Sequence, residues 1–474
     1  MTEHVSITTT LPYVNSDPHV GHALEFVQAD ILARYHRMLG NEVFFNTGTD
    51  EHGIKIYRKA EEAGEDVQAY VDRYAARFSM LKETLDLSYD AFIRTTDPKH
   101  IAAAQEFWKQ CEKNGDIYKK EYKVKYCVGC ELEKTDSELE DGVCPMHPTT
   151  PVESIEEENY FFRFSKYQEP LLDLYRERPD FVVPPQRQNE IRSFVERGLQ
   201  DFSISRIKDK MPWGIPVPGD EDHVMYVWFD ALVNYISTLD WPDEAYATWW
   251  PSIQLAGKDN LRQQSAMWQA MLLSAGIEPS KQILIHGFIT SGGHKMSKSV
   301  GNVISPMDLV DTYGTDAVRY YFARHIHPFE DSDLTHERFH ECYTANLVNG
   351  IGNLVSRVMK LAETHLDKVE LPEDTEPPLE YTNAIETYRF NEAMDIIWAK
   401  IGVVDQRMTD EAPFKVVKTD PEEGKRIIAE LAAELYTIGR LLEPFLPSTS
   451  ARILETVRAN KKPDTMFPRV EQAE

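Results

Sequence analysis

A turn between a predicted strand and a predicted helix, Asn15-Ser16-Asp17-Pro18-His19-Val20-Gly21-His22, decides the fold of this chain. Before it, residues 5–9 alternate with the period of a strand, and the polar and proline residues 15–18 are typical of a turn. After it, apolar residues recur at helical spacing up to position 38, and Gly40 is placed to end that helix. We therefore expect both histidines of the stretch at a strand-to-helix turn.

Such a turn is suited to bind phosphate. Backbone N–H groups and the dipole at a helix N-terminus favour an anion, and Gly21 lets a phosphate approach the main chain. The imidazoles of His19 and His22 can donate hydrogen bonds to charge that develops on it. A tetrapeptide of this kind also arises by chance, with capping and surface histidines, so taken alone it is weak evidence.

A second candidate for phosphate binding lies far along the chain, at Lys295-Met296-Ser297-Lys298-Ser299. It follows a predicted apolar strand at residues 283–288, and glycines flank it, so the loop can move. The ammonium groups of Lys295 and Lys298 can follow the charge of a departing pyrophosphate. A solvated loop is the alternative interpretation, but the two motifs together are rarely met by accident, and they predict activation of a carboxylate by ATP.

Further strings accompany the two motifs in a fixed order. They are Leu11-Pro12-Tyr13-Val14-Asn15, Asn46-Thr47-Gly48-Thr49-Asp50-Glu51-His52-Gly53, Trp213-Gly214-Ile215-Pro216-Val217-Pro218, Tyr226-Val227-Trp228-Phe229-Asp230-Ala231, Gly257-Lys258-Asp259 and Tyr313-Gly314-Thr315-Asp316-Ala317. With them the chain resembles class I aminoacyl-tRNA synthetases, and among these the methionyl-tRNA synthetases, over nearly its whole length. The resemblance implies a ligase that activates L-methionine with ATP to methionyl-adenylate and transfers it to the 3′-terminal ribose of tRNA(Met), including initiator tRNA. It also implies Mg²⁺ with the ATP, for which the sequence shows no dedicated ligand set.

The resemblance further implies which residues form the site. The catalytic residues would be His19, His22, Lys295 and Lys298, and ATP would also contact Gly21 and Asp259. The methionine contacts would be Leu11, Tyr13, Asp50, Trp228, Ala231, Tyr235, Gln264 and Trp268. Asp50 would pair with the α-ammonium group, and the aromatic rings would surround the polarizable thioether. The chain departs from the family's pattern at Gln264, where relatives have histidine, and at Leu232, which is often proline.

Three of the five cysteines cluster with a histidine, as Cys127-x2-Cys130, thirteen residues, and Cys144-x2-His147. Two such short-spaced pairs can converge on one tetrahedral zinc ion, and four protein ligands predict a structural site. Disulfides are the alternative, but the odd number of cysteines and the adjacent histidine argue against them. Relatives more often have four cysteines, so His147 is a departure. The remaining Cys111 and Cys342 are expected to be ordinary buried thiols.

The formal net charge of −27 argues against sequence-independent binding of nucleic acid, because such proteins are basic overall. An acidic protein can still bind RNA through a local basic face. The sequence has no stretch that approaches a membrane span, and it opens with neither an apolar signal nor an arginine-rich leader. We therefore expect a cytoplasmic protein.

The expected fold class is α/β: a doubly wound, parallel-sheet catalytic domain of the Rossmann type, split by a zinc-knuckle insertion and followed by an all-α bundle. The expected boundaries are 1–115 for the first catalytic half, 116–218 for the insertion, 219–340 for the second half and 341–474 for the helical domain. In the second half we expect the parallel sheet to resume near 225–229, with strands at 253–257 and 283–288 around a helix near 260–275.

The resemblance makes the helical domain the anticodon-binding part. Helices are predicted at 346–366 and 424–442, with a solvated connector at 371–378. The family's anticodon positions match Asn353, Arg357 and Phe414, although relatives commonly have tryptophan at the last, and a surface amide is the alternative for Asn353. The sequence shows no trailing strand-rich module, so we expect a monomer.

Three other functions fit parts of the sequence. A class I ligase for another aliphatic amino acid usually needs a large editing insertion, and residues 116–218 are short for one. An adenylating enzyme that works without tRNA fits the acidic charge and Gln264. A non-catalytic RNA-binding or scaffold protein would not need both motifs.

Overall fold

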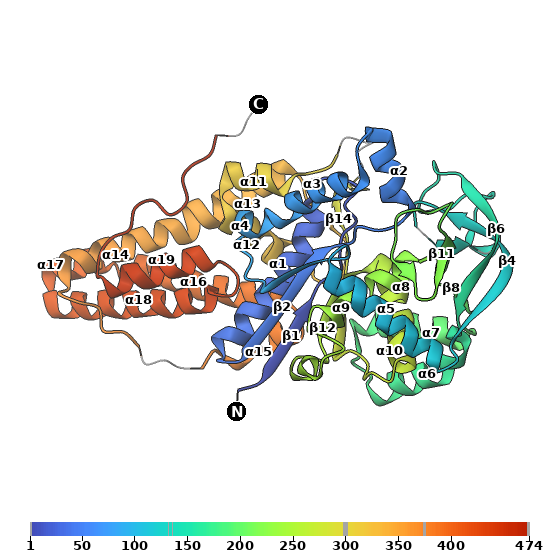
Figure 1. The fold of residues 1–474 in the computed structure, drawn as a ribbon. Coiled ribbons are helices and arrows are strands. Elements are labelled where there is room, and N and C mark those ends of the chain that lie inside the picture. The colour runs from blue at the N-terminus through green and yellow to red at the C-terminus, as the bar shows by residue number, and fades with distance from the viewer. Residues whose placement is uncertain (1, 131, 135, 297–301, 373–375, 472–474) are drawn as a thin grey trace.

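A six-stranded sheet forms the centre of the protein (Figure 1). The computed structural model describes residues 2–130, 132–134, 136–296, 302–372 and 376–471. Because every neighbouring pair in this sheet runs parallel, the carboxyl ends of all its strands meet at one edge. In spatial order the strands are β3 (Ala91–Arg94), β2 (Glu42–Thr49), β1 (His4–Thr8), β12 (Ile253–Gly257), β13 (Gln282–His286) and β7 (Val182–Val183).

The direction in which the chain builds this sheet reverses between β1 and β12. The register there pairs Ile7 with Ile253, so the two catalytic halves of the sequence join directly. In open α/β sheets the crevice at such a reversal is where ligands bind. The predicted strands 5–9, 253–257 and 283–288 are confirmed, within a residue or two at their ends.

Helix α1 (Val20–Met38) follows β1 and is confirmed as predicted. Its apolar face is buried, and Gly40, with a φ of +83°, lies just beyond its end. The two histidines cap its N-terminus reciprocally: the His19 ring accepts the Gly21 N–H and the His22 ring accepts the His19 N–H. The strand-to-helix turn expected for these histidines is therefore present.

One predicted strand is wrong. Residues 225–229 do not resume the parallel sheet: β11 (Asp220–Met225) pairs antiparallel with β9 (Ser205–Ile207) and β10 (Pro216–Val217), and a short helix, α8 (Val227–Ala231), follows. The run is apolar because α8 is largely buried, and a short apolar run does not distinguish a buried helix from a strand.

The insertion is built on an antiparallel sheet at one end of the molecule (Figure 1). Its long hairpin, β4 with β6, pairs from Ile117 with Phe162 to Cys127 with Val152, so the hairpin delivers the first cysteine of the cluster. The edge strand β7 of the central sheet comes from within residues 116–218, whose boundaries stay a prediction. The elements here are β5 (Leu132–Lys134), β4 (Ile117–Cys127), β6 (Val152–Phe162), β8 (Phe202–Ser203), α6 (Gln168–Glu177) and α7 (Pro185–Glu196), with 3₁₀ turns at Asp136–Glu138 and Phe164–Tyr167.

The part of the molecule outside the bundle contains further helices. The helix predicted near 260–275 is confirmed, although it begins with a π-helical turn, Gln263–Met267, before α10 (Trp268–Ser274). The others are α2 (Ile54–Ala63), α3 (Val67–Ser79), α4 (Leu81–Thr84), α5 (Pro98–Lys113), α9 (Asn234–Ser237), α11 (Pro306–Tyr313) and α12 (Thr315–His325), with 3₁₀ turns at Glu244–Thr248 and Lys258–Asn260. A small sheet holds β15 (His294–Lys295), β14 (Ile289–Ser291) and β16 (Ser332–Asp333).

A helical bundle forms the end of the molecule opposite the insertion (Figure 1). Among the described residues from 336 onward there is no strand, which confirms the all-α prediction. Its helices are α13 (His336–Cys342), the π-helical segment Tyr343–Gly352, α14 (Asn353–His365), α15 (Leu379–Glu386), α16 (Phe390–Asp410), α17 (Pro413–Thr419), α18 (Pro421–Leu442) and α19 (Pro447–Arg458). Within the described part of the chain, no helix has the length and apolar character to cross a membrane.

A fully buried ion pair joins α12 to α1, and its arginine also reaches the bundle. The Arg319 guanidinium on α12 lies 2.8 Å from Asp30 Oδ2 on α1, and neither side chain is exposed. Arg319 also donates to the carbonyl oxygens of Pro444 and Phe445, which follow α18. Burial opposes the charge of Asp30, but Arg319, Arg34 and Ser88 outweigh it and lower the pKa of the Asp30 carboxyl.

We predict that Arg319→Met lowers the free energy of unfolding by about 3–5 kcal/mol, because it removes one of the two guanidinium groups paired with the buried Asp30 carboxylate and the donor to the Pro444 and Phe445 carbonyls. Urea denaturation followed by circular dichroism measures this loss. Lys123→Met, which removes the exposed pair with Glu156, serves as control and should leave the unfolding midpoint in place. Equal midpoints for both variants would contradict the prediction.

Candidate active site

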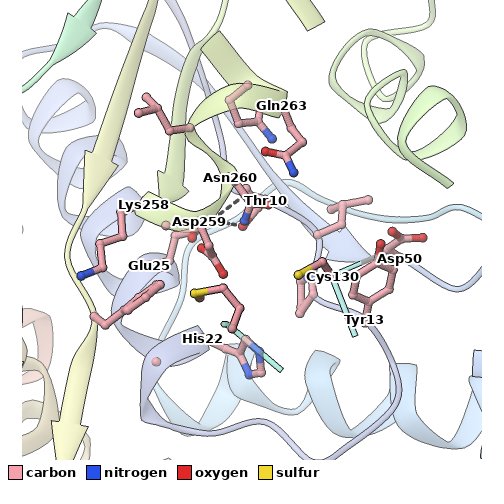
Figure 2. A pocket seen from close by; sticks show the side chains of 18 of the residues that line it. Thr10, Tyr13, His22, Glu25, Asp50, Cys130, Lys258, Asp259, Asn260 and Gln263 are labelled. Atoms are coloured by element: carbon pink, nitrogen blue, oxygen red, sulfur yellow. Dashed lines mark hydrogen bonds between the residues drawn. The ribbon is translucent and has the colours of Figure 1, made fainter. Parts of the chain in front are cut away.

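A cavity of about 860 Å³ opens at the carboxyl edge of the sheet, between the core and the insertion (Figure 2). It lies at the reversal between β1 and β12, where the fold predicts a ligand. The predicted site residues that line it are Leu11, Tyr13, His19, Gly21, His22, Asp50, Cys130, Cys144, His147, Trp228, Ala231, Tyr235, Asp259 and Gln264. The structure thus brings together residues from both catalytic halves and from the insertion.

The two capping histidines form one side of this cavity. Their rings are stacked, with centroids 3.8 Å apart. Burial and the neighbouring His19 hold the pKa of His22 well below its usual value, so His22 is neutral. Since its Nδ1 accepts the His19 N–H, its proton belongs on Nε2, which can donate to an anion. A Cβ on Gly21 would come within 2.9 Å of the His19 ring, so a larger residue here would push that ring from its capping position.

A buried carboxylate marks the other side. Asp50 follows β2 and is fixed by backbone hydrogen bonds: its N–H donates to Pro12 at 3.0 Å, and its carbonyl accepts from Val14 at 3.2 Å. Figure 2 shows its carboxylate beside the Tyr13 ring. Asp50 is 2% exposed, so a charged partner there would be desolvated and strongly held.

Beyond Asp50 lies an apolar slot with aromatic walls. Tyr13 and Trp228 meet edge to face at 6.4 Å, and Tyr235 and Ala231 are buried. The Gln264 amide donates to the Tyr235 hydroxyl at 2.7 Å, which orients both side chains. Trp268 packs against Tyr235 at 5.9 Å and supports the wall.

Two residues of the cavity were not predicted from the sequence. Glu25 accepts the N–H and the hydroxyl of Thr10 at 2.6 and 2.7 Å, and its other oxygen lies 2.8 Å from His286 Nε2. Burial opposes the charge of His286, but the hydrogen bond and charge of Glu25 prevail and raise its pKa. Figure 2 shows Glu25 near Asp259. The sequence offered one signal for Glu25: it is an acidic residue one helical turn after His22, on the apolar face of α1.

The cysteine cluster has the geometry of a metal site. The ligand atoms of Cys127, Cys130, Cys144 and His147 all lie within 4.8 Å of one another. Cys130 Sγ is 3.5 Å from Cys144 Sγ and 3.2 Å from His147 Nδ1. All three cysteines are free thiols, so the disulfide alternative is not realised. A Cβ on Gly129 would lie 2.5 Å from the His147 ring, which explains the glycine there.

Of the other predicted residues, Asn353, Arg357 and Phe414 lie in the helical bundle. Lys295 ends β15, and Lys298 lies outside the described residues. Asn353 is exposed at the start of α14, and Phe414 on α17 is 41% exposed. Arg357 lies 2.8 Å from Asp405 in an ion pair. The roles of these residues stay predictions.

Comparison with known proteins agrees with this geometry. A family model described as "tRNA synthetases class I (M)" matches residues 5–151 and 129–359. The methionine–tRNA ligase of Mesorhizobium japonicum is 40% identical over 480 residues, covering 97% of this chain and 93% of that protein. This chain belongs to the methionine–tRNA ligase family. The methionine–tRNA ligase of Thermosynechococcus vestitus is 48% identical over 375 residues, covering 77% of this chain and 70% of that protein.

Solved structures of this ligase family match the whole fold. Mycobacterium tuberculosis methionyl-tRNA synthetase in complex with methionyl-adenylate has a TM-score of 0.89 and 35% identity, with 96% of this chain and 94% of that chain covered. Its apo form has a TM-score of 0.83 and 30% identity, with 100% and 99% covered. The predicted enzyme class and function, ligation of methionine to tRNA, are confirmed.

We predict a pH-dependent stability from the His286–Glu25 pair. The pKa of His286 is higher in the folded state than the usual histidine value of about 6.5. Its positive charge therefore gives its full stabilisation of the native state at pH values below about 6.5. This stabilisation is lost as the pH rises through the pKa of the folded state. His286→Gln keeps a donor toward Glu25 but cannot be charged. Thermal unfolding should therefore show a larger wild-type advantage at pH 6 than at pH 9, and a gap that is constant or grows with pH would contradict this assignment.

Proposed function

We propose that methionine and ATP bind in the cavity in one orientation, with the amino acid's ammonium group at Asp50 and the phosphates at the N-terminus of α1. The observation that carries this proposal is that a single cavity joins a buried carboxylate and an aromatic slot to the histidine-capped helix. Asp50 carries the charge that complements an ammonium group, and the helix N-terminus favours an anion. The carboxylate of methionine then lies between them, facing the α-phosphate.

The methionine side chain occupies the slot beyond Asp50. A thioether is polarizable and makes favourable contacts with aromatic rings, which Tyr13, Trp228 and Tyr235 offer here. Gln264 and Tyr235 hydrogen-bond to each other, so the slot presents a polar group that does not titrate near neutral pH. Leu11 and Ala231 complete its apolar lining, and Trp268 supports Tyr235 from behind.

At the end of the cavity near α1, one carboxylate oxygen of methionine attacks the α-phosphorus of ATP in line. A new oxygen–phosphorus bond forms, and the bond to the bridging oxygen breaks, so pyrophosphate leaves with the electron pair. Neutral His22 donates a hydrogen bond to the charge on the transferring phosphate, and the dipole of α1 adds to it. Lys295 and Lys298 are assigned to the departing pyrophosphate, Mg²⁺ accompanies the ATP, and Asp259 and Gly21 border the nucleotide.

The metal held by the cysteine cluster is zinc in this proposal. Three sulfur ligands and one imidazole fit Zn²⁺, and four protein ligands leave no open position for catalysis. Cys130, Cys144 and His147 also line the cavity, so the ion holds the shape of one cavity wall.

The transfer step needs tRNA(Met) bound along the molecule, from the cavity to the helical bundle. Asn353, Arg357 and Phe414 are the proposed anticodon contacts, with Phe414 exposed enough to stack on an unpaired base. The cytoplasm is the proposed location, because it keeps the cluster's free thiols reduced. The monomeric state stays a prediction.

We predict that His22→Asn, which loses the Nε2 donor, and Lys298→Ala each lower the rate of methionine-dependent pyrophosphate–ATP exchange by about a hundredfold, because each removes a stabilising group from the transition state. The dissociation constant for methionine should stay within about twofold, since neither residue contacts the amino acid. His4→Gln, at an exposed histidine on the opposite end of β1, serves as control. Wild-type exchange rates in both variants would refute the assigned roles.

We predict one zinc ion per chain, measured by inductively coupled plasma mass spectrometry on the purified protein. Cys144→Ala should lose the ion and lower the thermal unfolding midpoint, because the cluster would then hold uncompensated thiols. Cys342→Ala removes a thiol outside the cluster and should keep a full equivalent of zinc. Zinc retained by Cys144→Ala at wild-type level would rule out this ligand set.

A further inference from the structure

A buried cluster beside the methionine end of the cavity has no part in the mechanism above. Each carboxylate oxygen of Asp230 accepts one imidazole N–H: Oδ1 lies 2.8 Å from His100 Nε2, and Oδ2 lies 2.7 Å from His52 Nδ1. The far nitrogen of His100 lies 2.9 Å from the Ser237 hydroxyl. Asp230 and His100 have no exposed surface, and His52 is 5% exposed.

Both hydrogen bonds to the Asp230 carboxylate are charge-assisted. Burial alone would raise the pKa of Asp230, but His52 and His100 outweigh it and lower the pKa, so the carboxylate keeps its charge. A buried carboxylate is costly unless donors satisfy its oxygens. Each imidazole is therefore held to the carboxylate in a defined direction, and neither can move without exposing a buried charge to an apolar surrounding.

The cluster connects the two groups that define the methionine site. His52 follows Asp50 by two positions, in the loop after β2, and Asp230 follows Trp228 by two positions on α8. His100 lies near the start of the long helix α5 and holds the other carboxylate oxygen of Asp230. The loop that presents the ammonium partner is thus tied through one carboxylate to the helix that presents an aromatic wall.

A second set of contacts holds the backbone around His52, so only the side chain of this residue can adjust between the loop and Asp230. The Trp213 indole N–H donates to the Glu51 carbonyl at 2.6 Å, and the Gly53 N–H donates to the Trp213 carbonyl at 3.2 Å. These bonds fix the backbone on both sides of His52. The His52 ring also lies against Trp213, with ring centroids 5.6 Å apart, and from there reaches Asp230.

We infer that His52, Asp230 and His100 are positioning residues for methionine: their hydrogen bonds set the separation between Asp50 and Trp228, and thereby fit the site to the length of the amino acid. This inference rests on the proposed placement of methionine in the cavity. None of the three touches the substrate, so their loss should weaken methionine binding and leave the chemistry of the phosphates largely intact.

The two histidines bind Asp230 through different nitrogens, which allows a matched test. An asparagine amide nitrogen lies near the position of Nδ1, and a glutamine amide nitrogen lies near that of Nε2. His52→Gln and His100→Asn therefore lose the donor, whereas His52→Asn and His100→Gln restore it. In pyrophosphate–ATP exchange, we expect the first two to raise KM for methionine about tenfold, with kcat and KM for ATP within about twofold, and the second two to recover most of the methionine affinity.

Two reference variants distinguish a failure of this inference from a failure of the proposed methionine placement. His223→Ala removes another buried histidine that contacts a carboxylate, Asp220, on β11, and it should lower the unfolding midpoint without changing KM for methionine. Asp50→Asn should weaken methionine binding; wild-type affinity in this variant would overturn the placement of methionine itself. If Asp50→Asn is defective but His52→Gln and His100→Asn keep the wild-type KM, the cluster serves stability alone and the inference is wrong. Equal defects in all four histidine variants would likewise overturn it, because restoring the donor would then have no effect.

Discussion

The parallel pairing of β1 with β12 is the constraint on which the rest of the structure depends. It joins strands from opposite halves of the catalytic sequence, through pairs such as Ile7 with Ile253, and it places the reversal of the sheet beside the N-terminus of α1. Because the carboxyl ends of parallel strands meet at one edge, the loops after β1, β2, β12 and β13 converge there. The neighbouring β1–β2 pairing holds Asp50 beside the histidines that cap α1, and the β1–β12 pairing brings Asp259 and His286 from the second half to the same cavity.

The sequence predicted the helices and strands whose apolar residues repeat with a clear period, and the candidate ligands whose spacing along the chain is typical of a site. The strands at 253–257 and 283–288, the helix capped by His19 and the Cys3His cluster all needed only local patterns. The resemblance added the methionine pocket, which local patterns do not reveal. The helix α8 was missed because a short apolar run has no distinguishing period. Glu25 with His286, and Asp230 with its histidines, were missed because each pair is distant in sequence and meets only through tertiary packing.

The cavity is shaped from both ends of the molecule. On one side the hairpin of β4 and β6 carries the cysteine cluster to the cavity, so that Cys130 and His147 become part of its wall. On the other side Arg319 pairs with Asp30 on α1 and donates to two carbonyl oxygens of the bundle, which connects the bundle to the helix that His19 and His22 cap. In the proposed function a molecule with a net charge of −27 binds the phosphates at the N-terminus of α1, while its overall acidity discourages non-specific contact with RNA.

The orientation of methionine and ATP in the cavity is the central claim, and a crystal structure with methionyl-sulfamoyl-adenosine, a stable analogue of methionyl-adenylate, tests it most directly. We expect its ammonium group within hydrogen-bond distance of Asp50, its thioether between Trp228 and Tyr235, and its sulfamoyl group at the N-terminus of α1 beside His22. An analogue bound with its ammonium group away from Asp50, or with its side chain outside the aromatic slot, would contradict the account.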